Sequence, residues 1–355
     1  MKKWICDHIK STIAVFIFGT IPMSIGAAES CRILFQEIQI KKSVVTNIHG
    51  EKFFIIPVAN NLKMAYRDER PSKWNGITYV LTPGLSESSA FFDSHAVALL
   101  KMGYRVVRLE PLNIGQSLLA QAGAPRLNLN LQADAMAQAQ VIQSLNLKPN
   151  TAILYGHSRG AAISLIIENL MGPHFFKRIY ISNSYVRWLA NVYKQQANEQ
   201  ISAATKWMQL FNPFYYNPAM KGYIDNQSKI WSQIYANYGV DFAIGMTNFK
   251  DIVRKKIQNR SAQKATGLDL ETEVEGVMAQ YNAMIDSSIL EYAQRAQKNG
   301  TDIRIGVGEN DILVPKLIVD ELNDALGTQV DTQFPGGHMS PIDQFDRFIK
   351  WITQE

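Results

Sequence analysis

The sequence predicts an α/β fold with a mostly parallel central sheet, helices on both sheet faces and a helical insertion. Two observations support this prediction. Short runs of β-branched and aromatic residues alternate with longer helix-like segments, which is the order expected of βαβ units. The alternation stops between residues 185 and 300 and then resumes. Because crossovers between parallel strands are right-handed, the connecting helices should cover both faces of the sheet.

The expected elements follow one another in a regular order. Clusters between Arg32 and Arg67, separated by turn residues, indicate antiparallel strands at one sheet edge. The expected inner strands span residues 77–82, 104–109, 151–155, 178–182, 302–307 and 328–334. The expected helices span residues 89–102, 131–145, 159–170, 315–326 and 341–352. We therefore divide the chain into a core of residues 29–184 and 301–355 and an insertion of residues 185–300.

The first 28 residues have the pattern of a signal peptide. Three lysines and an apolar run over residues 13–25 precede small residues at 26–28, where signal peptidase cleaves. The apolar run is short for a membrane-spanning helix, which needs about 20 residues. We expect cleavage after Ala28 and a periplasmic or secreted protein, with membrane contact only through the signal segment. The alternative is an uncleaved membrane anchor.

Composition narrows the function further. The 355 residues are 46% hydrophobic and 19% charged, the balance of a folded protein, and the net charge of +5 is too small to indicate a nucleic-acid partner. Cleavage would leave Cys31 as the sole cysteine, so no internal disulfide is expected. No residues cluster with metal-ligand or nucleotide-binding spacing, so we expect no metal and no cofactor.

The strongest motif is Gly156-His157-Ser158-Arg159-Gly160. It follows an apolar strand and precedes an apolar helix, which is the context of a nucleophile elbow. The nucleophile of such an elbow has a strained backbone, and bulky neighbours would clash there. We therefore predict that Ser158 is a nucleophile.

A serine hydroxyl needs a general base, and a third group must orient that base. His338 is the best candidate among six histidines, because it follows a predicted strand and is far from Ser158 along the chain. The other histidines lie in the signal segment, before the serine or too close after it: His8, His49, His95, His157 and His174.

The third group should be a carboxylate from the loop between the elbow and His338. Asp311 and Glu309 both lie in the loop after the strand over residues 302–307. Either carboxylate could accept the imidazole Nδ1–H and stabilise the imidazolium. We prefer Asp311 for its position in the loop, and Glu309 stays open as the alternative.

From about Phe53 to its C-terminus, the chain resembles the α/β-hydrolase superfamily, with the order Ser158, Asp311, His338. Thr82-Pro83-Gly84-Leu85 stands where that superfamily carries its oxyanion loop, although Pro83 replaces the usual histidine. The resemblance implies that the backbone N–H groups of Leu85 and Arg159 bind the oxyanion. Glu87 is unexpected beside a developing negative charge, so we expect its side chain to turn away.

The insertion stands where the superfamily places a cap. Its many aromatic residues could line an acyl pocket or form a small core of the cap itself. A basic run over residues 250–264 and an acidic run over residues 269–275 are expected on solvated helix faces.

These observations favour an exported, carboxylesterase-like or lipase-like serine hydrolase. A serine nucleophile argues against epoxide opening and halide displacement, which use aspartate in this superfamily. The expected substrate is a small-molecule ester or a lipid-like ester. Two alternatives remain: an acyltransferase with the same three residues, and a non-catalytic protein that uses a hydrolase fold for binding.

Overall fold

The computed structural model describes residues 42–187, 249–259, 266–285, 287–311 and 313–354. The expected signal peptide, Cys31 and the first strand cluster lie outside the described residues, as do residues 188–248 of the expected insertion. The described part of that insertion holds three helices and an isolated antiparallel bridge between Arg187 and Ser288. Its role as a cap stays a prediction.

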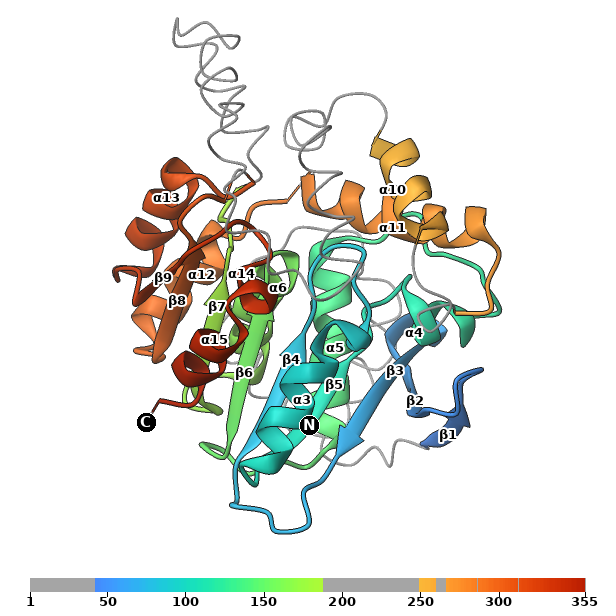
Figure 1. Cartoon of the computed structure of the whole chain (residues 1–355), viewed down its shortest axis with the longest axis horizontal. Coiled ribbons are helices and arrows are strands. Elements are labelled where there is room, and N and C mark those ends of the chain that lie inside the picture. Colours follow the sequence, from blue (N-terminus) through green and yellow to red (C-terminus); the bar gives the residue numbers. More distant parts are fainter. Residues whose placement is uncertain (1–41, 188–248, 260–265, 286, 312, 355) are drawn as a thin grey trace, which may run out of the picture. The chain divides into compact units, whose positions relative to one another are not determined.

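The described residues form one nine-stranded sheet (Figure 1). The strands are β1 (Ser43–Thr46), β2 (Lys52–Val58), β3 (Leu62–Glu69), β4 (Thr78–Thr82), β5 (Arg105–Leu109), β6 (Ala152–His157), β7 (Phe176–Ser182), β8 (Ile303–Gly308) and β9 (Thr332–Phe334). Their spatial order is β1-β2-β3-β5-β4-β6-β7-β8-β9. The pairs β1–β2, β2–β3 and β3–β5 are antiparallel, and the remaining pairs are parallel. The mostly parallel sheet is thus confirmed.

Helices lie between the strands along the chain and after the last strand. They are α3 (Asp93–Lys101), α4 (Gly115–Leu119), α5 (Leu131–Ser144), α6 (Arg159–Met171), α10 (Phe249–Gln258), α11 (Leu270–Ile285), α12 (Leu290–Lys298), α13 (Lys316–Leu326), α14 (Ser340–Asp343) and α15 (Phe345–Ile352), with the short 3-10 helices η1 (Ala59–Asn61) and η2 (Ser89–Phe92). The short α4 was not expected from the sequence. The expected helix over residues 89–102 is divided into η2 and α3, and the expected last helix into α14 and α15.

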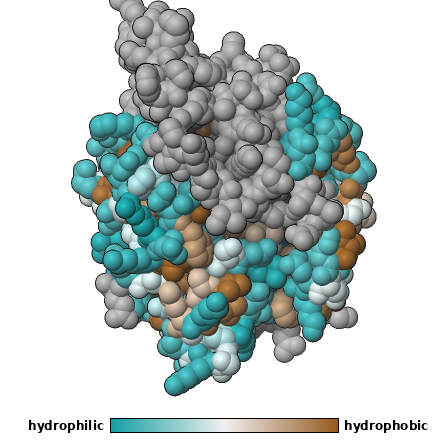
Figure 2. Space-filling view, viewed as in Figure 1, coloured by the Kyte–Doolittle hydropathy of each residue, from teal (hydrophilic) through white to brown (hydrophobic). Residues whose placement is uncertain are grey.

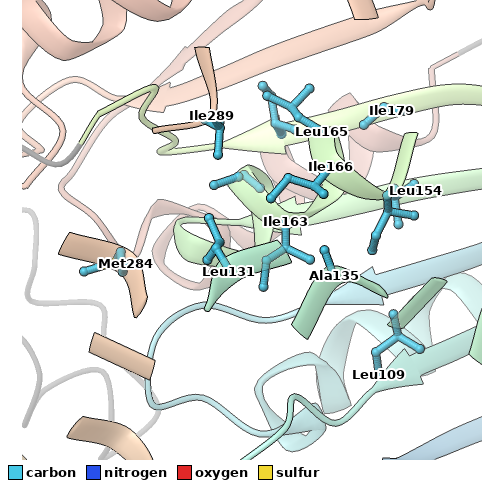
Figure 3. Packing of buried hydrophobic residues seen from close by; sticks show 14 of the residues in the cluster. Leu109, Leu131, Ala135, Leu154, Ile163, Leu165, Ile166, Ile179, Met284 and Ile289 are labelled. Atoms are coloured by element: carbon cyan, nitrogen blue, oxygen red, sulfur yellow. The ribbon is translucent and has the colours of Figure 1, made fainter. Parts of the chain in front are cut away.

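The core lies on both faces of the sheet because side chains alternate along each strand. On β4, Tyr79 and Leu81 face the layer of α3 and α15, whereas Val80 faces the layer of α5 and α6. Figure 3 shows the second layer, where Leu154 of β6 and Ile179 of β7 lie among side chains of α6. Burial of these apolar side chains supplies the main favourable free energy of folding.

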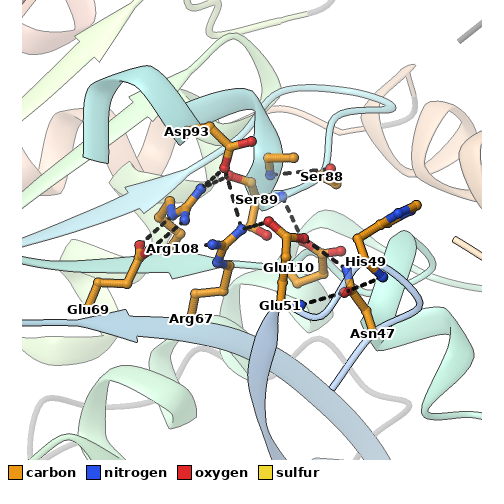
Figure 4. A network of polar contacts seen from close by, with 11 residues as sticks. Asn47, His49, Glu51, Arg67, Glu69, Ser88, Ser89, Asp93, Arg108 and Glu110 are labelled. Atoms are coloured by element: carbon orange, nitrogen blue, oxygen red, sulfur yellow. Dashed lines mark hydrogen bonds and ion pairs between the residues drawn. The ribbon is translucent and has the colours of Figure 1, made fainter. Parts of the chain in front are cut away.

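A polar network ties α3 to the sheet (Figure 4). Arg108 on β5 is only 1% exposed, and its Nε and Nη2 each lie 2.8 Å from a carboxylate oxygen of Glu69. Its Nη1 donates to Asp93 at the start of α3 and to the Ser89 carbonyl. The Glu110 carboxylate in turn accepts from the Ser89 N–H at 2.6 Å. This network fixes η2 and α3, and with them the end of the loop after β4.

The surface shown in Figure 2 mixes hydrophilic and hydrophobic residues over its described part, with the apolar residues in small groups. None of the described helices combines the length and the apolar composition needed to cross a membrane.

The expectation of two solvated charged runs is correct only in part. Lys250 and Glu275 are exposed, but Lys256 on α10 and Glu273 on α11 are only 4% and 7% exposed. Lys256 lies one helical turn after the buried Val253 and therefore shares its inward face. The charge pattern along the chain does not show which face of each helix packs inward.

His95 on α3 is a buried titratable group in the layer of α3 and α15. Its ring contacts phenylalanine rings of η2 and α15, and its Nε2 lies 3.1 Å from the Pro341 carbonyl oxygen. Burial lowers the pKa of His95 from 6.5 to about 4, so the folded protein holds this imidazole neutral near pH 5.

We predict that His95 makes the protein less stable in mild acid. The unfolded chain binds a proton near pH 6.5 that the folded chain accepts only near pH 4. The contribution of neutral His95 to the free energy of unfolding is therefore fully present above pH 6.5. It decreases as the pH falls, by about 2 kcal/mol at pH 4.5. Urea unfolding at pH 7 and pH 4.5 should show a smaller difference in His95→Phe than in the wild type. Equal differences in both proteins would contradict the prediction.

Candidate active site

Ser158 lies at a tight bend between β6 and α6. Its backbone has φ 52° and ψ −120°, a conformation that L-residues rarely adopt. A methyl group on Gly156 would lie 2.4 Å from the Gly160 carbonyl oxygen, and one on Gly160 would lie 2.2 Å from the Thr82 carbonyl oxygen. Only glycine fits at either position, which explains the motif around Ser158.

The structure brings Ser158, His338 and Asp311 together. His338 Nε2 lies 2.9 Å from Ser158 Oγ, and His338 Nδ1 lies 2.7 Å from Asp311 Oδ2. The three residues follow the carboxyl ends of β6, β9 and β8, which meet at one edge of the parallel sheet. All three are buried, with exposed fractions of 8%, 8% and 5% for the serine, the histidine and the aspartate.

Asp311 is held by the backbone that follows it. Its Oδ1 accepts hydrogen bonds from the N–H groups of Leu313 at 2.8 Å and Val314 at 3.0 Å, which leaves Oδ2 directed at His338. Glu309, the alternative acid, is exposed. The structure therefore places Asp311, and not Glu309, beside the imidazole.

The Asp311 carboxylate selects the tautomer of His338. A carboxylate only accepts hydrogen bonds, so Nδ1 carries the proton that points to it. The lone pair on Nε2 then faces the Ser158 hydroxyl and can accept its proton. This arrangement can convert a weak hydroxyl nucleophile into a reactive one.

The two residues expected to bind the oxyanion lie in segments next to Ser158. Arg159 is the first residue of α6, and the first N–H groups of a helix have no partner within it. Leu85 lies in the turn after β4, and its N–H donates to no backbone carbonyl in the described part of the chain. A methyl group on Gly84 would lie 3.3 Å from Ser158 Cβ, so this turn is packed directly against the serine.

The Arg159 side chain has a separate role in the core. Its Nη2 donates to Asp134 Oδ2 on α5 at 2.7 Å, and both side chains are fully buried. Asp134 Oδ1 also accepts from the Leu112 N–H at 3.1 Å. This pair joins the elbow to α5 and to the loop after β5, and sequence reasoning missed it.

The expectation that Glu87 turns away from the serine is wrong. Its side chain is 8% exposed and folds back, and Oε2 accepts from the Gly84 N–H at 2.9 Å. A methyl group on Gly84 would touch both this oxygen, at 2.9 Å, and Ser158 Cβ. The carboxylate closes the turn because it offers an acceptor to a buried N–H that would otherwise need another partner.

Asn183 is a further site residue that sequence reasoning missed. Its Nδ2 donates to the His338 carbonyl oxygen, and its Oδ1 accepts from the Gly308 N–H at 2.9 Å. Asn183 therefore fixes the loop of His338 against β8. Its place directly after a parallel strand was the available signal, because ligands and active sites lie at these strand ends.

His157 lies beneath His338. Its ring centroid is 5.1 Å from that of His338, and Phe91 stacks on it at 5.2 Å. Burial lowers the pKa of His157 well below its usual value, and the neighbouring His338 adds to the effect. His157 therefore stays neutral and adds no positive charge beside His338.

Among the described residues, no group of three or more His, Cys, Asp or Glu side chains could hold a metal ion.

Solved structures show the same fold. An esterase from Exiguobacterium antarcticum matches with a TM-score of 0.55 and 13% identity, covering 84% of this chain and 99% of that one. A probable hydrolytic enzyme from Pseudomonas aeruginosa matches with a TM-score of 0.55 and 15% identity, covering 90% and 95%. An enol-lactonase from Burkholderia xenovorans matches with a TM-score of 0.52 and 16% identity, covering 84% and 97%.

No protein-family model matches the sequence, and no curated protein matches it significantly. This chain thus resembles the solved structures in its fold and not in its sequence. Together with the strand order and the elbow at Ser158, it establishes that the chain has the α/β-hydrolase fold. This confirms the fold expected from the sequence.

We predict that Asp311, and not Glu309, controls the reactivity of Ser158. Asp311→Asn should slow labelling of Ser158 by a fluorophosphonate by roughly 10³-fold or more, because the amide favours the wrong tautomer of His338. Glu309→Gln is the matched control and should label at the wild-type rate. The second-order rate of labelling measures both variants. A slow Glu309→Gln with a normal Asp311→Asn would reverse the assignment.

Proposed function

We propose that this protein is a serine hydrolase that cleaves carboxylic esters through an acyl-enzyme intermediate. The observation that carries the proposal is the placement of His338 between Ser158 Oγ and Asp311 Oδ2, at 2.9 and 2.7 Å. Nucleophilic catalysis requires a hydroxyl, a base that accepts its proton and a carboxylate that orients the base, and these three buried side chains supply them in that order.

In the first half of the proposed reaction, Ser158 Oγ attacks the acyl carbon and its proton passes to His338 Nε2. Asp311 stabilises the imidazolium that forms. The N–H groups of Leu85 and Arg159 donate to the oxyanion, and such fixed donors stabilise the transition state without reorganising. The intermediate then collapses, the ester C–O bond breaks, and the alcohol leaves with the proton from His338.

In the second half, a water molecule attacks the acyl-enzyme. His338 accepts a proton from the water as the new C–O bond forms, and the same two N–H groups bind the oxyanion again. Collapse of this intermediate releases the carboxylic acid and returns the proton to Ser158. The reaction needs only the residues of this chain, the ester and water.

The choice of esters as substrates has two supports. A serine nucleophile with a histidine base suits acyl transfer to water. The structural neighbours include an esterase and an enol-lactonase, which supports hydrolysis of an ester-type bond at the level of the fold. We further propose that residues 185–300 form a cap that shapes the site for a small-molecule or lipid-like ester.

We predict that the protein hydrolyses p-nitrophenyl esters and that Ser158→Ala abolishes this activity. A series of esters with increasing acyl length should show a maximum in kcat/KM, because the acyl pocket has a finite size. Release of p-nitrophenolate measures each ester, and the folded Ser158→Ala protein is the control. Wild-type protein that neither turns over these esters nor reacts with a fluorophosphonate would favour a binding role. Preferential transfer to an added alcohol over water would favour an acyltransferase.

We also propose that the protein is exported and that residues 1–28 are removed. The support is the lysine-rich start, the apolar run and the small residues at its end. N-terminal sequencing of the protein after expression in a Gram-negative host should give Glu29 as the first residue of a periplasmic or secreted product. A membrane-bound product that retains Met1 would instead show an uncleaved anchor.

A further inference from the structure

The turn that carries Leu85 is in contact with two buried side chains from helices far along the sequence. Lys256 Nζ on α10 lies 2.7 Å from Ser86 Oγ and 3.5 Å from the Ser86 carbonyl oxygen. Gln280 Oε1 on α11 accepts from the Ser86 N–H at 3.4 Å, and its Nε2 donates to the Leu112 carbonyl at 2.8 Å. Ser86 is thus contacted through both its backbone polar groups and its hydroxyl.

Ser86 has a backbone that needs such support. Its φ is 61°, in the left-handed region that is unfavourable for residues other than glycine. The residue lies inside a turn in which the Glu87 N–H donates to the Gly84 carbonyl at 3.4 Å. A strained residue keeps its conformation only when its surroundings hold it there. Here the surroundings include Lys256 and Gln280.

Close packing does not supply that support on all sides. A cavity of about 60 Å³ borders Ser86, Glu87 and Ser88 on one side and Lys256 and Glu273 on the other. A cavity removes the van der Waals contacts that would otherwise fix a backbone segment. The hydrogen bonds to Ser86 therefore carry more of the positioning than they would in a filled core.

The charge on Lys256 strengthens this contact. Its side chain is only 4% exposed, and hydrogen bonds from a cation are shorter and stronger than those between neutral groups. A buried cation also needs acceptors, so its position and that of Ser86 constrain each other. Lys256 and Glu87 line the same cavity, so the positive charge of one partly offsets the negative charge of the other beside this turn.

We propose that Lys256, assisted by Gln280, is a positioning residue that holds the turn of residues 84–88 so that the Leu85 N–H points at the oxyanion. This role rests on the proposed hydrolase function. It couples the oxyanion site to α10, because displacement of this helix removes the contact with Ser86. Loss of the contact should lower kcat more than it changes KM, since the negative charge on the oxygen develops only as the transition state forms.

Lys256→Met tests the proposal, because it keeps the apolar length of the side chain and removes the charged donor. We expect kcat for a p-nitrophenyl ester to fall about 10- to 100-fold with KM changed less than about threefold, since small displacements at a reacting centre have such effects. A trifluoromethyl ketone, which forms an oxyanion on Ser158, should bind more weakly by a similar factor. The matched control is Lys255→Met, on the exposed face of the same helix, with wild-type kcat.

Ser86→Ala provides a second variant that removes the Oγ acceptor and leaves Lys256 in place. It should also lower kcat. Ser86 Oγ donates to the Leu85 carbonyl oxygen as well, so each change removes a contact of its own besides the shared Lys256–Ser86 hydrogen bond. In free energy, the loss in the double variant should therefore be smaller than the sum of the two single losses. If Lys256→Met does not fold, the kcat of Ser86→Ala tests the proposal by itself: a lower kcat supports it, and an unchanged kcat contradicts it. Wild-type turnover in the same assay reports separately on the proposed hydrolase. An active wild type with unchanged kcat and ketone affinity in the folded variants would overturn the positioning role.

Discussion

The contact between His338 Nε2 and Ser158 Oγ joins residues that are 180 positions apart, and much of the described structure serves to make it. Its two ends are held in different ways. Ser158 is fixed by a bend that only glycine neighbours permit, and His338 is fixed by Asp311 and by the contact of Asn183 with its backbone. A parallel sheet brings the two together, because the carboxyl ends of its strands meet at one edge.

This contact is buried, and the charged and neutral groups around it are fixed in place. Asp311 is the carboxylate directed at His338, whereas His157 beside it is kept neutral by burial. The turn after β4, which carries Leu85, packs against the serine at Gly84, and the Glu87 carboxylate closes that turn from within. Glu87 and Lys256, both buried, line one cavity beside this turn, so a carboxylate and a cation border the same space.

Sequence alone indicates the sheet, Ser158 and His338, because each depends on a local pattern: alternating strands and helices, an elbow motif, and a histidine after a late strand. The choice between Asp311 and Glu309 does not follow from a local sequence pattern. Both lie in one loop, and the decision comes from the backbone N–H groups of Leu313 and Val314, which orient one carboxylate.

The burial of these charged side chains could not be predicted from the sequence either. Arg159 and Asp134, and likewise Lys256 and Ser86, are distant in the chain, and nothing in their neighbours indicates a contact. Charged residues are usually solvated, so a pattern of charges along a helix predicts exposure until the packing of that helix is known. Glu87 shows the same limit at short range, because its direction depends on the turn that it closes.

The proposed reaction depends above all on Ser158 acting as the nucleophile. The most direct measurement is mass spectrometry of the protein quenched in acid during turnover of a slowly hydrolysed ester. We expect an added mass equal to the acyl group on the peptide that contains Ser158, and this mass should disappear as the ester is consumed. Turnover without any adduct on that peptide, or with an adduct on another residue, would contradict it.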